Sequence, residues 1–448
     1  MKKLITIIFT LFIITTPALA INDTTEYLNI PFWQKFNDDI LVENLLKVYE
    51  NNRDLKSAVL KTNEANRVVK MSFANELPHI GFEGYVGRIF KSSDELFGNV
   101  EIPNYAETHY YLPLTMNYEI DIWGKNHLIT KSKKKQFEMI KQDERSAYIY
   151  ITSAFAVDYF NLIRCDKLIE YQKQLIALQE QSINSYKIRY EYGTATLSEI
   201  DEAQKALTYM KEDLEKLLEK QDMLKNQIST LLGDRAFEDI NRSNYDDLNM
   251  SFTPPSEIDF NMLDKRPDRI KSELDLERIG IDVKVARRDL LPKFIITGNM
   301  GFNMYNLHSS HKFLADLGIV PAWDLFMGTR KLQLLKLKKD QFEIATQKYE
   351  KTILTAIQET NDALYSMKTA ENIKTVTNDR LNTDIKELNY TKIKEDAGTA
   401  DNLDLILQEE KLLITKKQAV SSDINKIISA VNLYQALGGI DFTQDSNL

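Results

Sequence analysis

The chain has 448 residues, of which 43% are hydrophobic, 27% charged and 10% aromatic; it therefore carries enough apolar material to fold and is not a disordered polymer. Its formal charge of −9 argues against general nucleic-acid binding. The single cysteine, Cys165, excludes an intramolecular disulfide and a cysteine-rich metal site.

Residues 1–20 have the three-part pattern of a secretory signal peptide. Lys2 and Lys3 supply the positive charge, the run 4–14 is mostly apolar, and residues 17–20 end in an Ala-x-Ala cleavage pattern. The alternative is an N-terminal membrane anchor, but a membrane span needs about 20 apolar residues and this run is shorter. We expect the mature chain to begin at Ile21. No cysteine stands at the cleavage site, so we expect no lipid anchor there.

The mature chain is predicted to contain two copies of one structural plan. Gly193 and Gly398 lie 205 positions apart (398 − 193), and so do Gly233 and Gly438 (438 − 233). A shared offset at two landmarks indicates an internal repeat. We therefore expect a first repeat over 21–233, a linker or equatorial segment over 234–262, and a second repeat over 263–448.

Each repeat is predicted to be mainly helical. The expected helices cover about 38–74, 125–192 and 194–232 in the first copy, and 264–290, 329–397 and 399–437 in the second. The two longest segments are rich in Lys, Glu, Gln, Leu, Ile and Ala, which favour helix. At 1.5 Å per residue each would be roughly 100 Å long, a length typical of coiled coils and tubes rather than of compact globules.

Four strands are predicted, at about 79–91, 107–123, 293–306 and 312–326. Apolar and polar residues alternate along them, most clearly over 112–122 and 294–304, which gives one apolar and one polar face. A half-buried sheet of a soluble protein has the same pattern. Strands of about 11 residues, an export signal and aromatic residues at the strand ends favour a membrane crossing instead. The predicted aromatic belt consists of Tyr110, Tyr111, Trp123, Tyr305 and Trp323.

Four strands are too few for one chain to cross a membrane alone. Open sheet edges are not tolerated in lipid, and the smallest single-chain barrels have about 8 strands. We therefore expect an oligomer, either a dimer with eight strands or a trimer with twelve. A lumen wide enough to pass solutes favours the larger number.

A series of short motifs in a fixed order is similar to the outer membrane factor family, the TolC-like channels, and most of all to its NodT-like drug-efflux branch. The resemblance covers nearly the whole mature chain. Its motifs are the opening pattern Trp33, Phe36, Asp38 and Leu41, then Asn51-x-x-Asp54-Leu55, Leu77-Pro78, Asp121-Ile122-Trp123-Gly124, Asp158-Tyr159-Phe160 and Arg266-Pro267-Asp268.

The resemblance implies an α+β membrane protein with mainly long coiled-coil helices and four transmembrane strands per chain. It implies a homotrimer with a 12-stranded β-barrel in the bacterial outer membrane, in contact with its lipid and continuous with a 12-helix α-barrel in the periplasm. Such a channel conducts drugs or other small compounds passively after docking with a periplasmic adaptor (membrane fusion) protein and an inner-membrane pump of the RND or ABC type. The sequence itself names neither the cargo nor the pump.

The two glycines at the predicted hairpin tips are candidate docking positions. Glycine lets the backbone reverse where a Cβ would clash, so these residues could also be simple turns. By resemblance, the adaptor docks at Gly193, Thr194, Ala195 and Leu197 of the first tip and at Gly398, Thr399 and Ala400 of the second.

A candidate periplasmic gate follows the second tip. The resemblance places a ring of leucine and aspartate there, at Leu403 and Asp404. Asp401 is an alternative lining acid, or an N-cap of the returning helix, and Asp404 could equally be a surface carboxylate. Some relatives brace the closed state with a basic residue two positions after the second glycine. This chain has Ala400 there, so Glu199 lacks that partner.

Two lysine clusters follow the strand pairs. They are Lys131, Lys133, Lys134 and Lys135, and Lys331, Lys336, Lys338 and Lys339. They are either solvated helix faces or contacts with lipid headgroups at the periplasmic rim of the barrel.

No metal-ligand spacing, cofactor fingerprint or nucleophile motif occurs in the sequence, so we expect neither a cofactor nor an enzyme. Two rival functions stay open. One is the exit duct of a type I protein secretion system, and the other is a non-conducting exported coiled-coil adhesin or scaffold.

Overall fold

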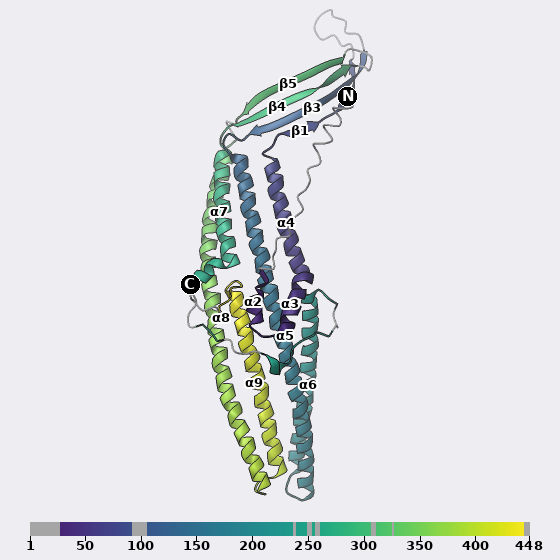
Figure 1. The fold of residues 1–448 in the computed structure, drawn as a ribbon. Coiled ribbons are helices and arrows are strands. Elements are labelled where there is room, and N and C mark those ends of the chain that lie inside the picture. Colours follow the sequence, from purple (N-terminus) through teal and green to yellow (C-terminus); the bar gives the residue numbers. More distant parts are fainter. Residues whose placement is uncertain are drawn as a thin grey trace, which may run out of the picture.

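The computed structural model describes residues 27–91, 105–235, 239–248, 253–255, 260–305, 311–324 and 327–442. The expected signal peptide lies outside these residues. The molecule is long and narrow, with an antiparallel sheet at one end and two helix hairpins at the other (Figure 1). The helices are α2 (Ile30–Gln34), α3 (Asp39–Asn51), α4 (Arg53–Ala74), α5 (Lys125–Glu191), α6 (Leu197–Leu232), α7 (Pro267–Arg288), α8 (Arg330–Asp396) and α9 (Asn402–Ala436), with 3₁₀ turns at Tyr245–Asp247 and Phe260–Lys265.

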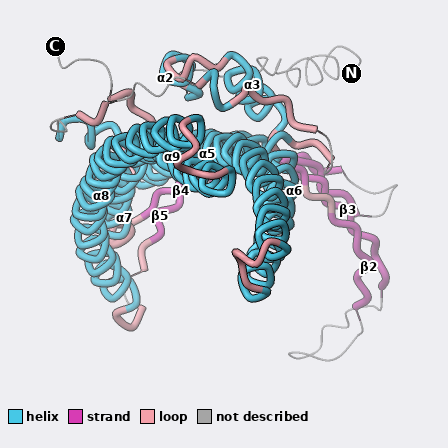
Figure 2. The backbone as a smooth tube through the Cα atoms, turned by 90° about the horizontal axis from the view of Figure 1, so that it is seen from below, coloured by secondary structure: helices cyan, strands magenta, loops and turns pink. Residues whose placement is uncertain are grey.

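The helices form one curved wall. Two of them, α5 and α8, run through its whole length. Next to the sheet α5 packs between α4 and α7, and α7 packs on α8; nearer the tips α5 packs between α6 and α9, and α9 packs on α8. Viewed along the wall from below, these helices follow an arc, and α2 and α3 lie on its convex side (Figure 2). The units α4–α5–α6 and α7–α8–α9 thus repeat one arrangement.

The two longest helices are uninterrupted because their sequences contain no helix-breaking residue. α5 and α8 contain neither proline nor glycine, and each has 67 residues, or roughly 100 Å of helix. The helix expected over 38–74 is wrong as a single element, because it breaks at Asn52. The Asn52 carboxamide oxygen accepts hydrogen bonds from the amides of Asp54 (2.9 Å) and Leu55 (3.1 Å), and its amide group donates to the Leu231 carbonyl (2.8 Å). Asn52 therefore starts α4 as an N-cap and ties it to α6.

The sheet contains β1 (His79–Phe82), β2 (Tyr85–Lys91), β3 (Tyr105–Ile120), β4 (Lys293–Tyr305) and β5 (His311–Ala322). Both β1 and β2 pair with β3, so the single strand expected over 79–91 is interrupted at residues 83 and 84. β3 also pairs with β4, and β4 with β5, all antiparallel. The expected strands 107–123 and 312–326 end earlier, at Ile120 and Ala322, so both belt tryptophans follow their strands.

An aromatic core fills the middle of the wall. Phe32 stacks on Tyr434 of α9 with a centroid distance of 4.1 Å, and Phe36 packs against Phe160 of α5 at 5.4 Å. Asp38 is buried there and accepts hydrogen bonds from the Tyr159 hydroxyl (2.8 Å) and the Ser243 hydroxyl (2.9 Å). The motif Trp33, Phe36, Asp38 therefore holds the N-terminal segment to the helical wall.

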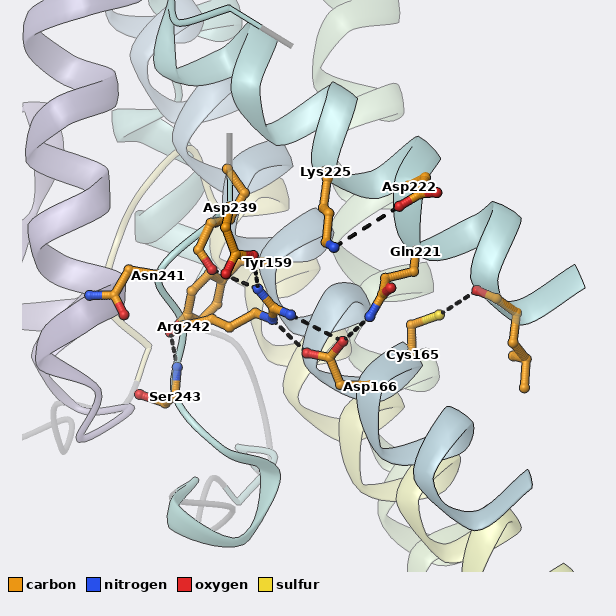
Figure 3. Close-up of polar contacts among 12 residues, drawn as sticks. Tyr159, Cys165, Asp166, Gln221, Asp222, Lys225, Asp239, Asn241, Arg242 and Ser243 are labelled. Carbon is orange, nitrogen blue, oxygen red and sulfur yellow. Dashed lines mark hydrogen bonds and ion pairs between the residues drawn. The ribbon is translucent and has the colours of Figure 1, made fainter. Parts of the chain in front are cut away.

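Polar contacts hold residues 239–248 of the equatorial segment against α5 (Figure 3). Asp166 of α5 receives the Arg242 guanidinium (2.5 Å) and the Gln221 amide (2.5 Å). The thiol of Cys165 is buried and donates to the Leu217 carbonyl (3.2 Å). Burial raises its pKa to about 11, so the thiol stays protonated and unreactive.

Arg266 joins the three helices of the second repeat. Its guanidinium donates to Asp268 (2.7 Å), to Glu359 of α8 (2.6 Å) and to the Ala436 carbonyl at the end of α9 (2.5 Å). Burial alone would raise the pKa of Asp268, yet the hydrogen bonds and charge of Arg266 hold it below its usual range. The Arg266-Pro267-Asp268 motif is thus an anchor of the fold.

Among the described residues, no helix is long and apolar enough to cross a membrane.

Candidate functional site

One face of the sheet is mostly apolar, and much of it is exposed. The register pairs Leu112 with Phe302, Leu114 with Met300, Tyr118 with Ile296, Phe302 with Phe313, and Ile296 with Ile319. The side chains of Phe313, Leu317 and Ile319 are 57%, 75% and 64% exposed. An apolar patch of this extent on a folded chain marks a surface that another apolar phase covers.

The opposite face is mostly polar, although it also carries Leu314 and the pair Ile295–Val320. Asn117 pairs with Thr297, Thr115 with Asn299, and Asn299 with Asp316. The Asn299 amide also donates to the Asp316 carboxylate at 3.2 Å. A sheet with lipid-compatible residues on one face and hydrophilic residues on the other matches the alternation of transmembrane barrel strands.

The belt residues lie at two levels. Trp123 and Trp323 follow β3 and β5 at the helical end, where their indole N–H groups donate to the carbonyls of Pro292 (2.7 Å) and Leu290 (3.2 Å). Tyr110 pairs with Met304 on the apolar face near the far end of β4, but Tyr111 pairs with Asn303 on the polar face, so its predicted place in a lipid-facing belt is wrong. The side chain of Tyr305 lies outside the described part.

The register from Ile120–Phe294 to His109–Tyr305 spans eleven steps, or roughly 37 Å of strand. At a tilt of about 45° this covers roughly 26 Å of depth, close to the thickness of a hydrocarbon core.

The two hairpin tips have the same backbone geometry. Gly193 and Gly398 have φ of 70° and 68°, in the left-handed region that favours glycine. The following amides of Thr194 and Thr399 donate to the carbonyls of Arg189 and Lys394, both at 2.8 Å. A Cβ added to either glycine would meet nothing within 4 Å. Both tips are therefore open to a partner, with the Leu197 side chain also exposed.

Each returning helix begins with a capping box. Thr196 and Glu199 form it at α6, and Asp401 and Asp404 form it at α9, where the Asp404 amide donates to Asp401 (3.0 Å) and the Asp401 amide to Asp404 (3.1 Å). Asp401 is therefore the N-cap of α9, which is one of the two roles predicted for it. Hydrogen bonds from the Thr196 amide and hydroxyl lower the pKa of Glu199.

An ion pair joins the two hairpins at their ends. The Arg189 guanidinium of α5 contacts the Asp401 carboxylate of α9. Both side chains are partly exposed, so the pair is sensitive to salt. It connects the first and second repeats at the tip end of the wall.

Above this pair, α5 and α9 meet along a seam. On α9 its positions recur every three or four residues, the spacing of a coiled-coil interface: Leu403, Ile406, Glu410, Leu413, Lys417, Val420, Ile424 and Ile427. The Lys417 ammonium donates to Gln172 of α5. Glu410 is 9% exposed, and one of its carboxyl oxygens is buried without a hydrogen-bond partner among the described residues. Burial raises its pKa to about 7.

The profile of the family described as "Outer membrane efflux protein" matches residues 45–234 and 261–439. This chain belongs to the outer membrane efflux protein family.

Similar proteins cover most of the chain. The toluene efflux pump outer membrane protein TtgC of Pseudomonas putida is 24% identical over 91% of this chain and 84% of its own length. The cation efflux system protein CusC of Escherichia coli K12 is 22% identical over 94% and 91%. The crystal structure of the Campylobacter jejuni CmeC outer membrane channel aligns with a TM-score of 0.80 at 20% identity, over 92% of this chain and 89% of that chain.

Within this efflux-protein fold, the predicted gate residues do not all face the same way. Asp401 and Asp404 are exposed, whereas Leu403 is 3% exposed and packs in the seam. The described arrangement therefore does not favour a pore-lining ring made by Leu403. The exposed leucine of this turn is Leu407.

Two features were missed by sequence reasoning. The sequence did contain a signal for Arg189, because a basic residue stands four positions before each tip glycine. Arg189 precedes Gly193, and Lys394 precedes Gly398. Pairing with Asp401 follows only from the wall's geometry. Glu410 had a weaker signal, as a charge at an otherwise apolar position of a 3–4 spacing.

Proposed function

We propose that this efflux-family protein is a passive exit duct of the outer membrane. The observation that carries the proposal is a single curved wall whose sheet exposes an apolar face and whose long helices continue away from it. The sheet crosses the membrane, and the helices project into the periplasm without a lipid anchor. No chemical step is required, because a duct only has to offer a continuous polar path.

The duct is a homotrimer. One protomer presents an open sheet, with β1 and β2 at one edge and β5 at the other, and sheet edges in lipid must be paired. On α8, Leu354, Tyr365 and Val376 are exposed and spaced by eleven residues, which keeps them on one face of a helix. Three copies joined edge to edge bury this stripe and close a barrel of twelve strands.

The partners are a periplasmic adaptor at the tips and an inner-membrane pump of the RND or ABC type. The open tip glycines support docking there. The relatives carry names as different as toluene and cation efflux, which supports drugs or other small compounds as cargo, selected by the partners rather than by the duct.

The direct test of this function is conductance in planar bilayers, with the oligomer mass measured in mild detergent. We expect a trimer that gives small, cation-preferring steps, because the exposed Asp404 carboxylates of three copies add negative charge at the tip end of the duct. A monomer, or a trimer that stays silent even with Asp404→Ala, would instead support the adhesin or scaffold.

Docking at the tips has its own test. Asparagine tolerates the left-handed conformation, so Gly193→Asn with Gly398→Asn keeps both turns and adds side chains where an adaptor would contact them. We expect normal trimers and normal conductance, but cellular drug export lowered severalfold.

The matched control for the tip variant is Gly328→Asn. Gly328 also has a positive φ (57°) and open surroundings, but it lies beside the sheet at the opposite end of α8. Equal export by the tip variant and this control would place adaptor docking elsewhere.

A further inference from the structure

A basic groove lies between α5, α7 and α8, close to the sheet. Its volume is about 770 Å³, and its floor includes Gly280, Ile281 and Phe342. Five basic side chains and two carboxylates line it, an excess of three positive charges (5 − 2). These charged residues are Lys131, Lys135, Lys284, Arg287 and Lys339, with Glu277 and Glu343.

Most of the groove's cations have no carboxylate partner. Lys135 is the exception, at 2.7 Å from Glu277 and 3.1 Å from Glu138. Among the described residues, no ion pair involves Lys131, Lys284, Arg287 or Lys339, and all four are exposed. Their charges are therefore free to bind an anion.

The groove opens on the convex side of the wall. One face of α5 carries side chains separated by steps of three and four residues. These side chains include Lys131, Lys135, Arg145, Ile149 and Phe160. Phe160 packs on Phe36 of the N-terminal segment, and α2 and α3 of that segment lie on the convex side (Figure 2). A convex-side groove faces the surroundings of the tube, not its lumen.

The groove also has the depth of lipid headgroups. Lys131 lies roughly 9 Å from the start of α5, and Lys284 roughly 6 Å from the end of α7, at 1.5 Å per residue. The headgroup layer extends roughly 5–8 Å beyond the hydrocarbon on each side, and a lysine or arginine side chain bridges the remaining distance.

We infer that this groove binds an anionic phospholipid of the membrane's periplasmic leaflet. The lipid phosphate lies among Lys131, Lys284, Arg287 and Lys339, and its glycerol portion rests on Ile281 and Phe342. Basic pockets between helices at a membrane surface suit such headgroups. The inference rests on the membrane placement of the sheet in the proposed function.

The test is lipid retention by the trimer, counted by native mass spectrometry after extraction from vesicles of phosphatidylglycerol and phosphatidylcholine into mild detergent. The wild type should keep phosphatidylglycerol in preference to phosphatidylcholine. Lys284→Gln with Arg287→Gln should lower its retention about tenfold.

The control variant is Lys61→Gln with Lys133→Gln. Lys133 follows Lys131 by two residues on α5, but both control residues line a different groove, between α4 and α5. This variant should retain phosphatidylglycerol like the wild type.

Three outcomes would overturn the inference. The first is equal retention of phosphatidylglycerol by the two double variants, and the second is equal retention of the two lipids by the wild type. The third is displacement of the lipid by millimolar inorganic phosphate, which would assign the groove to a free anion. Conductance of the same preparations separates these outcomes from failure of the proposed function, since a conducting trimer without lipid preference contradicts only the groove assignment.

Discussion

Neutralising Arg189 should open the duct. The Arg189–Asp401 ion pair joins the first hairpin to the second at their ends. A basic residue two positions after the second tip glycine cannot serve as the brace here, because this chain has Ala400 at that position. An exposed ion pair contributes roughly 0.5 kcal/mol, so three in a trimer shift the closed–open equilibrium by about tenfold. We expect Arg189→Gln to raise mean single-channel conductance severalfold in planar bilayers.

Asp401→Asn is the matched partner variant. Asparagine keeps the N-cap of α9 and removes only the charge. Because both variants delete the same interaction, the double variant should conduct no more than either single one. Additive increases would show that the two residues act on different contacts.

Salt gives a second readout for this pair. The screening length falls to about 3 Å at 1 M salt, so the wild type at high salt should approach the open fraction of Arg189→Gln, corrected for bulk conductivity. An open fraction that is independent of salt in the wild type would contradict a brace made by this pair.

The repeating elements could be predicted from the sequence because their signals are local. Strand faces follow from alternation over 112–122, and helix ends follow from Gly193, Gly233 and Gly398. The break at Asn52 is only partly local, because its side-chain oxygen caps α4 within two and three residues. The other part is tertiary, a hydrogen bond from its side-chain amide to Leu231 of α6. A propensity pattern carries no record of such a partner.

The candidate gate was harder to predict, because its composition depends on which residues of two distant helices meet. Leu403 fits a leucine ring by its position in the chain, but α9 turns it into the seam with α5. Conversely, Arg189 and Asp401 are 212 positions apart, and only the pairing of the hairpins brings them together. Resemblance pointed to this turn of α9 as the candidate gate without specifying which of its side chains would face the lumen.

Glu410 should make the stability of the protein depend on pH with an unusual sign. Its pKa rises from an ordinary value near 4.5 to about 7 because the seam buries it. The folded state therefore holds the proton more tightly than the unfolded state. This contribution is most favourable below about pH 4.5, is lost progressively as pH rises to 7, and is constant above that value.

The shift corresponds to about 3 kcal/mol per protomer lost between those limits. Glu410→Gln keeps the shape of the side chain without the charge. We expect its apparent melting temperature to equal that of the wild type at pH 4.5 and to exceed it by several degrees at pH 8. Glu409→Gln removes a carboxylate outside the 3–4 series, 3.9 Å from Lys392 of α8, and should not raise the melting temperature at pH 8.

The same charge bears on gating, because the seam that buries Glu410 ends at the Arg189–Asp401 pair. A carboxylate ionised inside the seam weakens the contact between the hairpins, so wild-type conductance should rise between pH 5 and pH 8, and Glu410→Gln should flatten that rise. A pH-dependent melting difference without any change in conductance would show that the hairpins open without parting along α5 and α9. Identical melting curves for Glu410→Gln and wild type would show that the carboxyl is hydrated in the folded trimer.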